Sequence, residues 1–560
     1  MQILRLISFV TLLLISISAW SADAFYYNFT GYTLTGTPGN DAQLTSFNAL
    51  LVRDGRVTAV GNKQQLESMF PELTKQQRID LGGRYVLPGL IDAHGHVLGL
   101  GQNLQLVDLR DATSEQHAAE LVANYARNNP DYEWIIGRGW NQELWHERHF
   151  PSLQSLQEIS NDRPVYLTRV DGHAAWVNAK ALELAGINAA TLDPEGGQII
   201  RDSNGQPTGV LIDNAMQLVA HLIPAPTIEQ QQDALKLAFS HLLQHGITGV
   251  HDAGIDATTF AAYQQLAKQS QLPLRIYGML AATEPRLPEL LAAGPYFSAD
   301  DKLTVRSVKI YGDGALGSRG AALLSPYHDA PSQRGLMVTS PERIQRLFQL
   351  IIAHGFQVNT HAIGDRANRI VLDAYERTFA AIGGRHLRHR IEHAQIVHSD
   401  DIPRFKQLDI IASMQPTHAT SDMNMAEDRL GTERMKGAYA WQTFAQQQTI
   451  IAAGSDFPVE YANPFFGLHA AVTRQDRHNQ PTDGWYAHEA LTLTQALRAF
   501  TLDAAYAAGQ EQQLGSLEPG KWADFIVLDQ DPFAQESTQL WHNSVLATII
   551  AGQVVYQAAD

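Results

Sequence analysis

Eight short apolar runs, most of them separated by helical stretches, are the feature that most constrains how this chain folds. Near-continuous apolar runs of this length are typical of strands buried on both faces, as in parallel sheets. Eight strand–helix units in succession predict an α/β fold with a parallel (β/α)₈ TIM barrel. The runs are Tyr85–His94, Thr248–His251, Leu274–Met279, Val305–Tyr311, Gln357–His361, His389–His393, Ile410–Met414 and Ile450–Asp456.

The two ends of the chain differ from this middle part. Short β-like runs separated by turn signals such as Asp54-Gly55 dominate residues 25–84 and 513–560. We expect these two segments to form one small β-sandwich domain, with the barrel over residues 85–512. The gap after the first run exceeds a usual connection, so residues 104–226 are expected to form an inserted subdomain after the first barrel strand.

The first 24 residues have the layout of a secretory signal peptide. Arg5 precedes the apolar run Leu6–Ile17, and Ala22-Asp23-Ala24 offers an A-x-A cleavage site. The alternative is a membrane anchor, but the run is short for a span of roughly 20 residues. The signal-peptide interpretation predicts an exported protein, periplasmic or secreted, without a stable membrane anchor after cleavage.

Composition excludes several classes of function. The chain has no cysteine, which excludes disulfides, thiolate nucleophiles and cysteine-type zinc sites, so any metal must be held by nitrogen and oxygen ligands. The formal net charge of −17 argues against a nucleic-acid partner, because phosphate binding needs a basic face. Composition leaves the oligomeric state open.

Side chains that bind metals occur at or within five of the eight apolar runs. His94 and His96 are two residues apart after the first strand, so both imidazoles face the same space. His361, His393 and Asp456 end three later runs. A single histidine is more often a satisfied polar residue than a ligand. However, the carboxyl ends of barrel strands form one active face, so their joint placement predicts a metal site.

Lys309 lies within the fourth apolar run, where a charged ammonium group is costly to bury. Two interpretations stay open. In the first, the side chain reaches water at the strand end. In the second, a neutral amine has combined with carbon dioxide to form a carbamate, an anion with two oxygens that can bridge two metals.

Several motifs together carry a resemblance to a known family. The strings PGLIDAHGH, KIYGDGALGSR, THAIGD, RIEHAQ and GSDFPV occur in the order found in the amidohydrolase superfamily. More narrowly, the chain resembles the YtcJ-like metal-dependent hydrolases of amidohydrolase family 3, a group that includes N-substituted formamide deformylase. The segment Gly515–Asp529 also resembles the return to the β domain in that superfamily. The resemblance extends over essentially the whole mature chain.

This resemblance implies a set of metal ligands and a mechanism. It implies a divalent metal cofactor, two zinc ions or in some relatives one. By resemblance, His94, His96 and Asp456 bind the more buried metal, carboxylated Lys309 bridges the two, and His361 and His393 bind the second. A metal-bound hydroxide would attack a carbonyl, while Asp456 takes the proton and passes it to the leaving nitrogen.

We therefore expect an amidohydrolase that acts on carbon–nitrogen bonds other than peptide bonds in a small amide-like substrate. The alternatives are a deaminase-like or esterase-like relative on the same scaffold, and a non-catalytic exported binding protein. Three more residues are candidates for substrate contact: His173, Trp140 and Arg319. The alternative for His173 and Trp140 is packing within the insertion, and the alternative for Arg319 is a structural ion pair.

Overall fold

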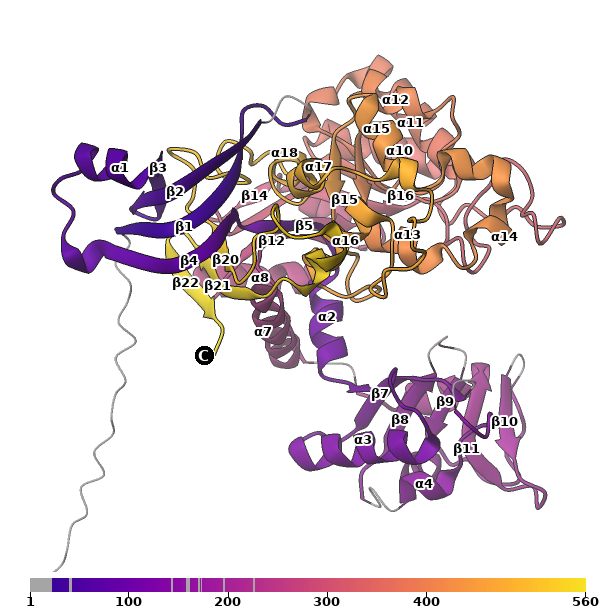
Figure 1. Ribbon diagram of the computed structural model, residues 1–560. Coiled ribbons are helices and arrows are strands. Elements are labelled where there is room, and N and C mark those ends of the chain that lie inside the picture. The colour runs from indigo at the N-terminus through magenta and orange to yellow at the C-terminus, as the bar shows by residue number, and fades with distance from the viewer. Residues whose placement is uncertain are drawn as a thin grey trace, which may run out of the picture. The chain divides into compact units, whose positions relative to one another are not determined.

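Each of the eight apolar runs contributes one parallel strand to a barrel-like sheet in the computed structural model (Figure 1). The structure describes residues 23–39, 43–142, 145–157, 162–169, 172, 174–194, 197–224 and 227–559. By contacts the chain divides into two compact units. The first comprises residues 1–95, 242–255 and 267–560, and the second comprises residues 96–241 and 256–266.

The barrel strands follow one another around the sheet in chain order. Each pairs in parallel with the next, and short β14 (Tyr296–Phe297) is added to β15 in antiparallel fashion. A backbone hydrogen bond from Asp456 N–H to His94 C=O (2.7 Å) joins the last strand to the first. The predicted α/β barrel is confirmed as a nearly closed eight-stranded sheet. Its strands are β5 (Leu90–Gly95), β12 (Ile247–Ile255), β13 (Arg275–Ala281), β15 (Leu303–Tyr311), β16 (Gln357–Ala362), β17 (Arg390–His393), β18 (Ile411–Met414) and β19 (Ile451–Ala453).

Helices connect these strands, and α10 (Pro341–Ala353) illustrates why they form where they do. Its N-cap Ser340 accepts a hydrogen bond from the Arg343 N–H, and Pro341 occupies the first turn, where its missing N–H costs nothing. The helix buries Ile344, Phe348 and Ile351 at the spacing of one helical face. Other helices of the first unit are α1 (Lys63–Met69), α9 (Leu287–Ala292), α11 (Asp365–Ile382), α12 (Ile402–Gln407), α13 (Pro416–Asp422), α14 (Ala426–Leu430), α15 (Trp441–Gln446), α16 (Pro464–Thr473), α17 (Leu493–Ala499) and α18 (Leu502–Ala507).

Both ends of the chain contribute to one seven-stranded mixed sheet, as expected from their β-like runs. The strand order is β22-β21-β20-β4-β1-β2-β3, so β4 lies between an N-terminal and a C-terminal strand. Tyr26 and Phe525 pack edge to face in its core, with ring centroids 5.0 Å apart. The strands are β1 (Ala24–Thr35), β2 (Gln43–Arg53), β3 (Arg56–Gly61), β4 (Arg78–Pro88), β20 (Phe525–Leu528), β21 (Val545–Ile550) and β22 (Gln553–Gln557).

The first apolar run differs from expectation, because it is two strands that serve two sheets. β4 ends at Pro88, opposite Phe525 in the terminal sheet, and β5 starts the barrel at Leu90. Gly89 makes the transition, and its N–H donates to the carbonyl of Asp524 at 2.9 Å. A Cβ at Gly89 would lie 2.3 Å from Thr248 Oγ1, so this close approach requires glycine.

The second unit contains the insertion as a six-stranded sheet of order β10-β11-β9-β8-β7-β6. Its core is rich in tryptophan, with Trp140, Trp145 and Trp176 all buried. The strands are β6 (Val107–Asp108), β7 (Ile135–Trp140), β8 (Val165–Arg169), β9 (Ala174–Val177), β10 (Gly197–Arg201) and β11 (Pro207–Asp213). The helices are α2 (Val97–Leu104), α3 (Glu115–Asn128), α4 (Leu153–Gln157), α5 (Ala179–Leu184), α6 (Gln217–Ala220), most of α7 (Ile228–Gln244) and most of α8 (Ala257–Lys268).

The expected signal peptide falls on residues 1–22, outside the described residues, and on the start of β1 at Ala24. Among the helices that the structure describes, none has the length and apolar character needed to cross a membrane.

Candidate metal centre

The carboxyl ends of the barrel strands hold the residues that sequence analysis selected as ligands. His94 lies in β5, Lys309 in β15, His361 in β16 and His393 at the end of β17, while Asp456 follows β19. His94 is 0% exposed and Lys309 1% exposed, so this end of the sheet buries polar groups that need partners.

Two groups of side chains have the geometry of metal sites. The ligand atoms of His94, His96 and Asp456 all lie within 4.8 Å of one another, and so do those of His393, His418 and Asp456. Asp456 belongs to both groups, and the His94 and His393 rings are 4.9 Å apart between centroids. The structure therefore brings together four of the six expected ligands, with Asp456 as the shared carboxylate, and adds His418.

The donor chemistry of these groups suits a divalent transition ion. Burial lowers the pKa of His94 to about 4, with the Lys309 charge as the next cause, so the ring is neutral near pH 7. Burial also lowers the pKa of His393 well below its usual range. Metal ligation needs neutral imidazole, and a set of imidazoles with one carboxylate fits zinc and similar ions.

His361 lies beside the second group and not within it. Its ring is 4.6 Å from the His393 ring between centroids, at a steep angle. Its Nε2 is buried, makes no hydrogen bond to any described residue, and lies 3.5 Å from Asp313 Oδ1. Burial lowers the pKa of His361 to about 3, which keeps the ring neutral. The expected role of His361 as a second-metal ligand stays a prediction.

Lys309 does not reach water, which removes the first of the two interpretations of its place in the strand. Its Nζ lies 3.0 Å from His94 Nε2 inside the cluster. Burial lowers the pKa of the amine to about 8, although the carboxylates of Glu392 and Asp456 act in the opposite direction. The fraction of neutral amine near pH 7 is thus larger than for an ordinary lysine.

His418 was not anticipated from the sequence. It lies in the first turn of α13, which begins directly after β18, and its Nε2 is 3.6 Å from Asp456 Oδ2. The His418 Nε2 is buried and makes no hydrogen bond to the described residues. The sequence does place this histidine four residues after the seventh apolar run. Ligands were expected at the strand ends themselves, and His418 lies beyond that position.

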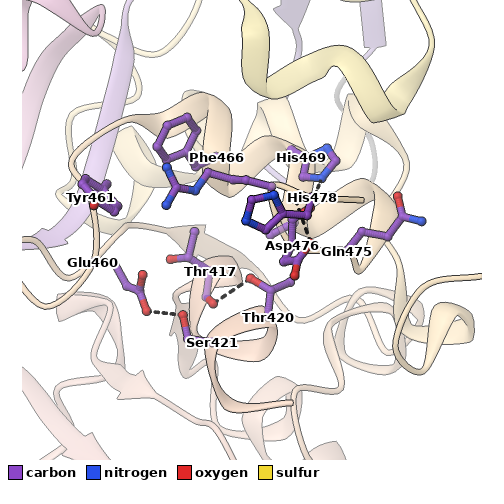
Figure 2. A pocket seen from close by; sticks show the side chains of 12 residues that line it. Thr417, Thr420, Ser421, Glu460, Tyr461, Phe466, His469, Gln475, Asp476 and His478 are labelled. Atoms are coloured by element: carbon purple, nitrogen blue, oxygen red, sulfur yellow. Dashed lines mark hydrogen bonds between the residues drawn. The ribbon is translucent and has the colours of Figure 1, made fainter. Parts of the chain in front are cut away.

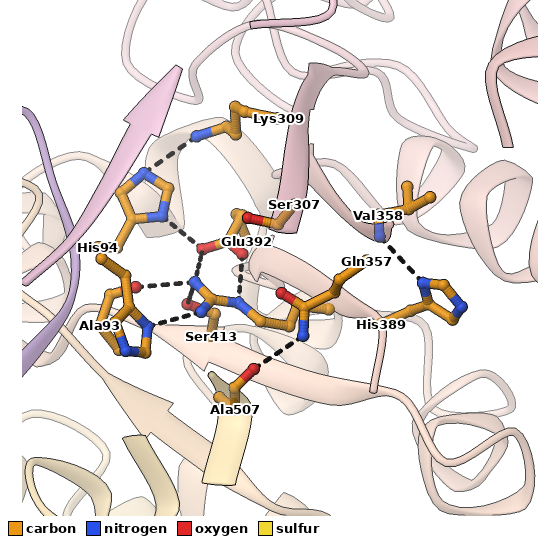
Figure 3. A network of polar contacts seen from close by, with 12 residues as sticks. Ala93, His94, Ser307, Lys309, Gln357, Val358, His389, Glu392, Ser413 and Ala507 are labelled. Carbon is orange, nitrogen blue, oxygen red and sulfur yellow. Dashed lines mark hydrogen bonds and ion pairs between the residues drawn. The ribbon is translucent and has the colours of Figure 1, made fainter. Parts of the chain in front are cut away.

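A buried ion pair between Glu392 and Arg390 orients the His94 ring through its Nδ1 (Figure 3). Glu392 Oε2 contacts His94 Nδ1, and both Glu392 oxygens accept hydrogen bonds from Arg390, at 2.7 and 2.9 Å. Burial is the largest single effect and would raise the pKa of Glu392, but the charges of Arg390 and His94 and their hydrogen bonds together hold that pKa well below its usual range. A carboxylate on Nδ1 keeps the proton there and leaves Nε2 of His94 as the ligand atom.

Arg390 is itself fully satisfied by the strands around it. Its guanidinium contacts His251 Nδ1 at 2.7 Å and donates to the Ala93 carbonyl at 2.7 Å and Ser413 Oγ at 3.2 Å. The Arg-x-Glu spacing places both charged groups on one face of β17. The Arg-x-Glu spacing is visible in the sequence of the sixth run, but only the final histidine of that run was predicted to be functional.

A second buried carboxylate, Asp92, joins the first barrel strand to the segment after the last. It accepts hydrogen bonds from the N–H and the hydroxyl of Ser455, the latter at 2.7 Å. Burial raises the pKa of Asp92 to about 7, and the Ser455 hydrogen bonds oppose that rise. A Cβ at Gly454 would lie 2.5 Å from the backbone nitrogen of His94, so the two segments approach as closely as glycine allows.

The three expected substrate contacts have other surroundings or fall outside the described residues. Trp140 is 0% exposed in the core of the insertion, and its indole N–H donates to the Leu167 carbonyl at 2.8 Å, which is the packing alternative. Arg319 forms an ion pair with Asp329 at 2.8 Å, which is the structural alternative. His173 lies outside the described residues.

The geometry agrees with comparisons to known proteins. A family model described as "Amidohydrolase family" matches residues 77–556. The chain belongs to amidohydrolase family 3. A relative from Bacillus subtilis (strain 168) named YtcJ is 34% identical over 516 residues, covering 91% of this chain and 96% of that protein. N-substituted formamide deformylase from Arthrobacter pascens is 27% identical over 544 residues, covering 92% and 96%.

A solved structure extends the likeness to the fold. An uncharacterized metal-dependent hydrolase from Pyrococcus horikoshii OT3 is 28% identical, with a TM-score of 0.74, covering 92% of this chain and 99% of that one. The chain is thus a hydrolase of the amidohydrolase superfamily with two His-His-Asp groups suited to divalent ions.

Proposed function

We propose that this amidohydrolase cleaves carbon–nitrogen bonds other than peptide bonds in a small amide-like substrate, with two divalent ions, zinc by preference. The observation that carries the proposal is the Asp456 carboxylate, shared between two histidine groups at the carboxyl end of the barrel. The relative from Arthrobacter pascens, which acts on N-substituted formamides by its name, supports the choice of bond.

The residues divide between the two ions by position. His94 and His96 would hold the first with Asp456, while His393 and His418 would hold the second, with His361 beside them. Lys309, as a carbamate, would bridge the two. The position of its Nζ, 3.0 Å from His94 Nε2 and 1% exposed, supports that role, because an added carboxylate would extend into the cluster. When bound, the ions would polarise a carbonyl and lower the pKa of water from about 15.7 towards about 7.

Asp456 would move the proton. The backbone holds this residue at φ 63° with its N–H bound to the His94 carbonyl, so the carboxylate has a fixed direction. Its two oxygens lie 3.6 Å from His94 Nε2 and 3.6 Å from His418 Nε2. Asp456 can therefore take a proton from the attacking water and give it to the leaving nitrogen.

The test combines metal analysis with a substrate screen. The purified protein is loaded with zinc, its metal content is measured, and amides, formamides and cyclic ureides are tested beside matched esters and aminoheterocycles. We expect about two ions per chain and turnover of an amide class. Turnover of esters or aminoheterocycles alone would favour the esterase-like or deaminase-like alternative. A chain that binds ligands without metal would instead be a binding protein.

The carbamate needs its own test, independent of turnover. Isotope-labelled bicarbonate should give a carbamate signal in the magnetic resonance spectrum of the wild type, and the signal should be lost in Lys309→Met. A wild-type protein that lacks the signal with both metals bound contradicts the bridging role of Lys309.

We also propose that residues 1–24 direct export and are then removed. The amino-terminal sequence of the protein recovered from a periplasmic or secreted fraction checks this proposal. A chain that keeps residues 1–24 and stays with the membrane would contradict it.

A further inference from the structure

The two metal groups differ in the partner that holds the far nitrogen of their buried histidine. In the first group, the Nδ1 of His94 contacts a carboxylate oxygen of Glu392, and both side chains are 0% exposed. In the second group, the Nδ1 of His393 lies 2.7 Å from Oε1 of Gln415. Gln415 is buried as well, so both contacts are shielded from water. One histidine is thus held by a charged oxygen and the other by a neutral one.

The orientation of the Gln415 amide follows from its second partner. Its Nε2 donates to the Ser413 carbonyl at 3.3 Å, and a carbonyl can only accept. The amide oxygen therefore faces His393, whose Nδ1 carries the proton, and the Nε2 of His393 is left for a metal. Gln415 directly follows β18, which pairs in parallel with β17, so the amide lies beside the strand end that carries His393.

The backbone of Gln415 contacts the other histidine of the second group. Gln415 is the N-cap of α13, and its carbonyl accepts from the His418 N–H at 3.1 Å. The residue thus contacts His393 through its side chain and His418 through its backbone. A substitution of the side chain leaves the backbone contact in place and changes the support of His393.

Charge decides how strongly each support favours a bound ion. An imidazole gains positive character when its Nε2 binds a metal, and a carboxylate on Nδ1 stabilises that character. Hydrogen bonds with one charged partner are also about twice as strong as bonds between neutral groups. Arg390 shares the Glu392 carboxylate, but the atom at His94 is still an anionic oxygen. Loss of such a partner typically costs about 10- to 100-fold in metal affinity.

We infer that the two metal groups bind their ions with unequal affinity, and that Gln415 is the positioning residue whose neutral amide makes the His393 group the weaker one. The inference rests on the proposed function for the presence of two ions. At limiting zinc, an ion occupies the group of His94, His96 and Asp456 first. The second ion binds later and exchanges faster, so the enzyme passes through a one-ion form.

Zinc binding tests this inference without reference to turnover. The metal-free protein is titrated with zinc against a chromophoric chelator, which should resolve two classes of site that differ at least about tenfold in Kd. Crystals grown with one equivalent of zinc should show anomalous density at the His94 group and not at the His393 group. Two sites of equal affinity, or first occupancy of the His393 group, overturn the inference.

Substitutions at Gln415 assign the weaker class. Gln415→Glu places a carboxylate at His393 and should tighten the weaker class at least about tenfold. Gln415→Met removes the acceptor at similar size and should weaken that class. Both variants should keep the tighter class unchanged, which shows in the same titration that they have folded. A weaker class that responds to neither substitution, or a shift of the tighter class instead, overturns the inference.

The matched control is Gln475→Met, which changes a second buried glutamine (Figure 2). Gln475 is 6% exposed, and its Nε2 donates to the carbonyls of Pro481 and Thr482, at 3.0 and 2.7 Å. It lines a cavity whose lining contains none of the metal-group residues. This variant should keep both zinc classes, and a loss as large as in Gln415→Met would overturn the role of Gln415.

The proposed function is judged separately. Two ions of equal affinity together with turnover of an amide would support the hydrolase and refute the inequality. Two unequal classes in a protein that turns over no amide would do the reverse. A single ion at saturating zinc overturns the inference, and turnover with that ion would leave the hydrolase standing.

Discussion

Replacing Glu392 by glutamine should destabilise the fold and weaken metal binding together. Both oxygens of Glu392 accept from Arg390, and one also contacts the proton-bearing nitrogen of His94. A glutamine side chain has one acceptor oxygen in place of two, so its NH₂ group would face a donor of Arg390 or His94. The exposed fractions of the Glu392 and Arg390 side chains are both 0%, so the substitution leaves the buried Arg390 charge without a counter-charge.

The magnitude follows from that burial. Removing one partner of a buried ion pair costs about 3–5 kcal/mol in the free energy of unfolding. Loss of the carboxylate behind a ligating histidine lowers metal affinity about 10- to 100-fold. Urea unfolding of the metal-free protein measures the first effect, and zinc competition with a chromophoric chelator measures the second.

The matched control is Glu511→Gln, the same change in a second bidentate pair. Glu511 bonds Arg388 at 2.6 and 2.8 Å, but the Arg388 side chain is 27% exposed, so water can replace part of the lost interaction. This variant should lose less stability and keep its metal affinity. If Glu392→Gln matches the wild type within about 1 kcal/mol and binds zinc equally well, the orienting role of Glu392 is refuted.

Three further predictions follow from other contacts. Gly89→Ala should lower the free energy of unfolding by about 1–3 kcal/mol, because its Cβ would meet the Thr248 side chain. The control Gly61→Ala has open space around the new Cβ and should keep the wild-type stability. Urea unfolding measures both variants, and equal stability of the two would contradict the argument. Asp456→Asn should keep some metal and lose turnover, and full activity in this variant would exclude a proton-carrying role. His389 is buried, and burial lowers its pKa from 6.5 to about 3. Its contribution to stability is therefore complete above about pH 6.5 and falls by about 1.4 kcal/mol per pH unit below it, because the unfolded chain then takes up a proton that the folded chain refuses. The slope of the free energy of unfolding against pH gives the number of protons taken up on unfolding. Replacing His389 by methionine should lower that number by about one between pH 6.5 and 5, and an unchanged slope would contradict this.

The barrel was predictable because parallel strands are buried on both faces and leave an apolar run in the sequence. The division of the first run between two sheets was not. It depends on the pairing of Pro88 with Phe525, far along the chain, and on the close approach of Gly89 to Thr248. Local sequence shows a Pro-Gly pair inside an apolar run, and does not show which sheet each half joins.

The metal groups were predictable where the ligand ends a strand, and less so elsewhere. His94, His393 and Asp456 were found because the carboxyl ends of barrel strands share one face. His418 was missed because it lies on a helix that follows a strand, and its position depends on how that helix turns back. Trp140 was a candidate for substrate contact because a large aromatic side chain suits either a pocket or a core, and only packing distinguishes them.

The join between β5 and β19 has a consequence for how the enzyme acquires its metal. The hydrogen bonds from Asp456 to the His94 carbonyl and from Ser455 to Asp92 connect the first barrel strand to be synthesised with the last. Contacts so distant in sequence form late in folding, because the intervening chain must be ordered first. A nascent chain thus lacks the shared carboxylate until its ring of strands is complete. Loading of a divalent ion would then be the final event of maturation, and the ion would stabilise the closed ring of strands, because it binds the folded state alone.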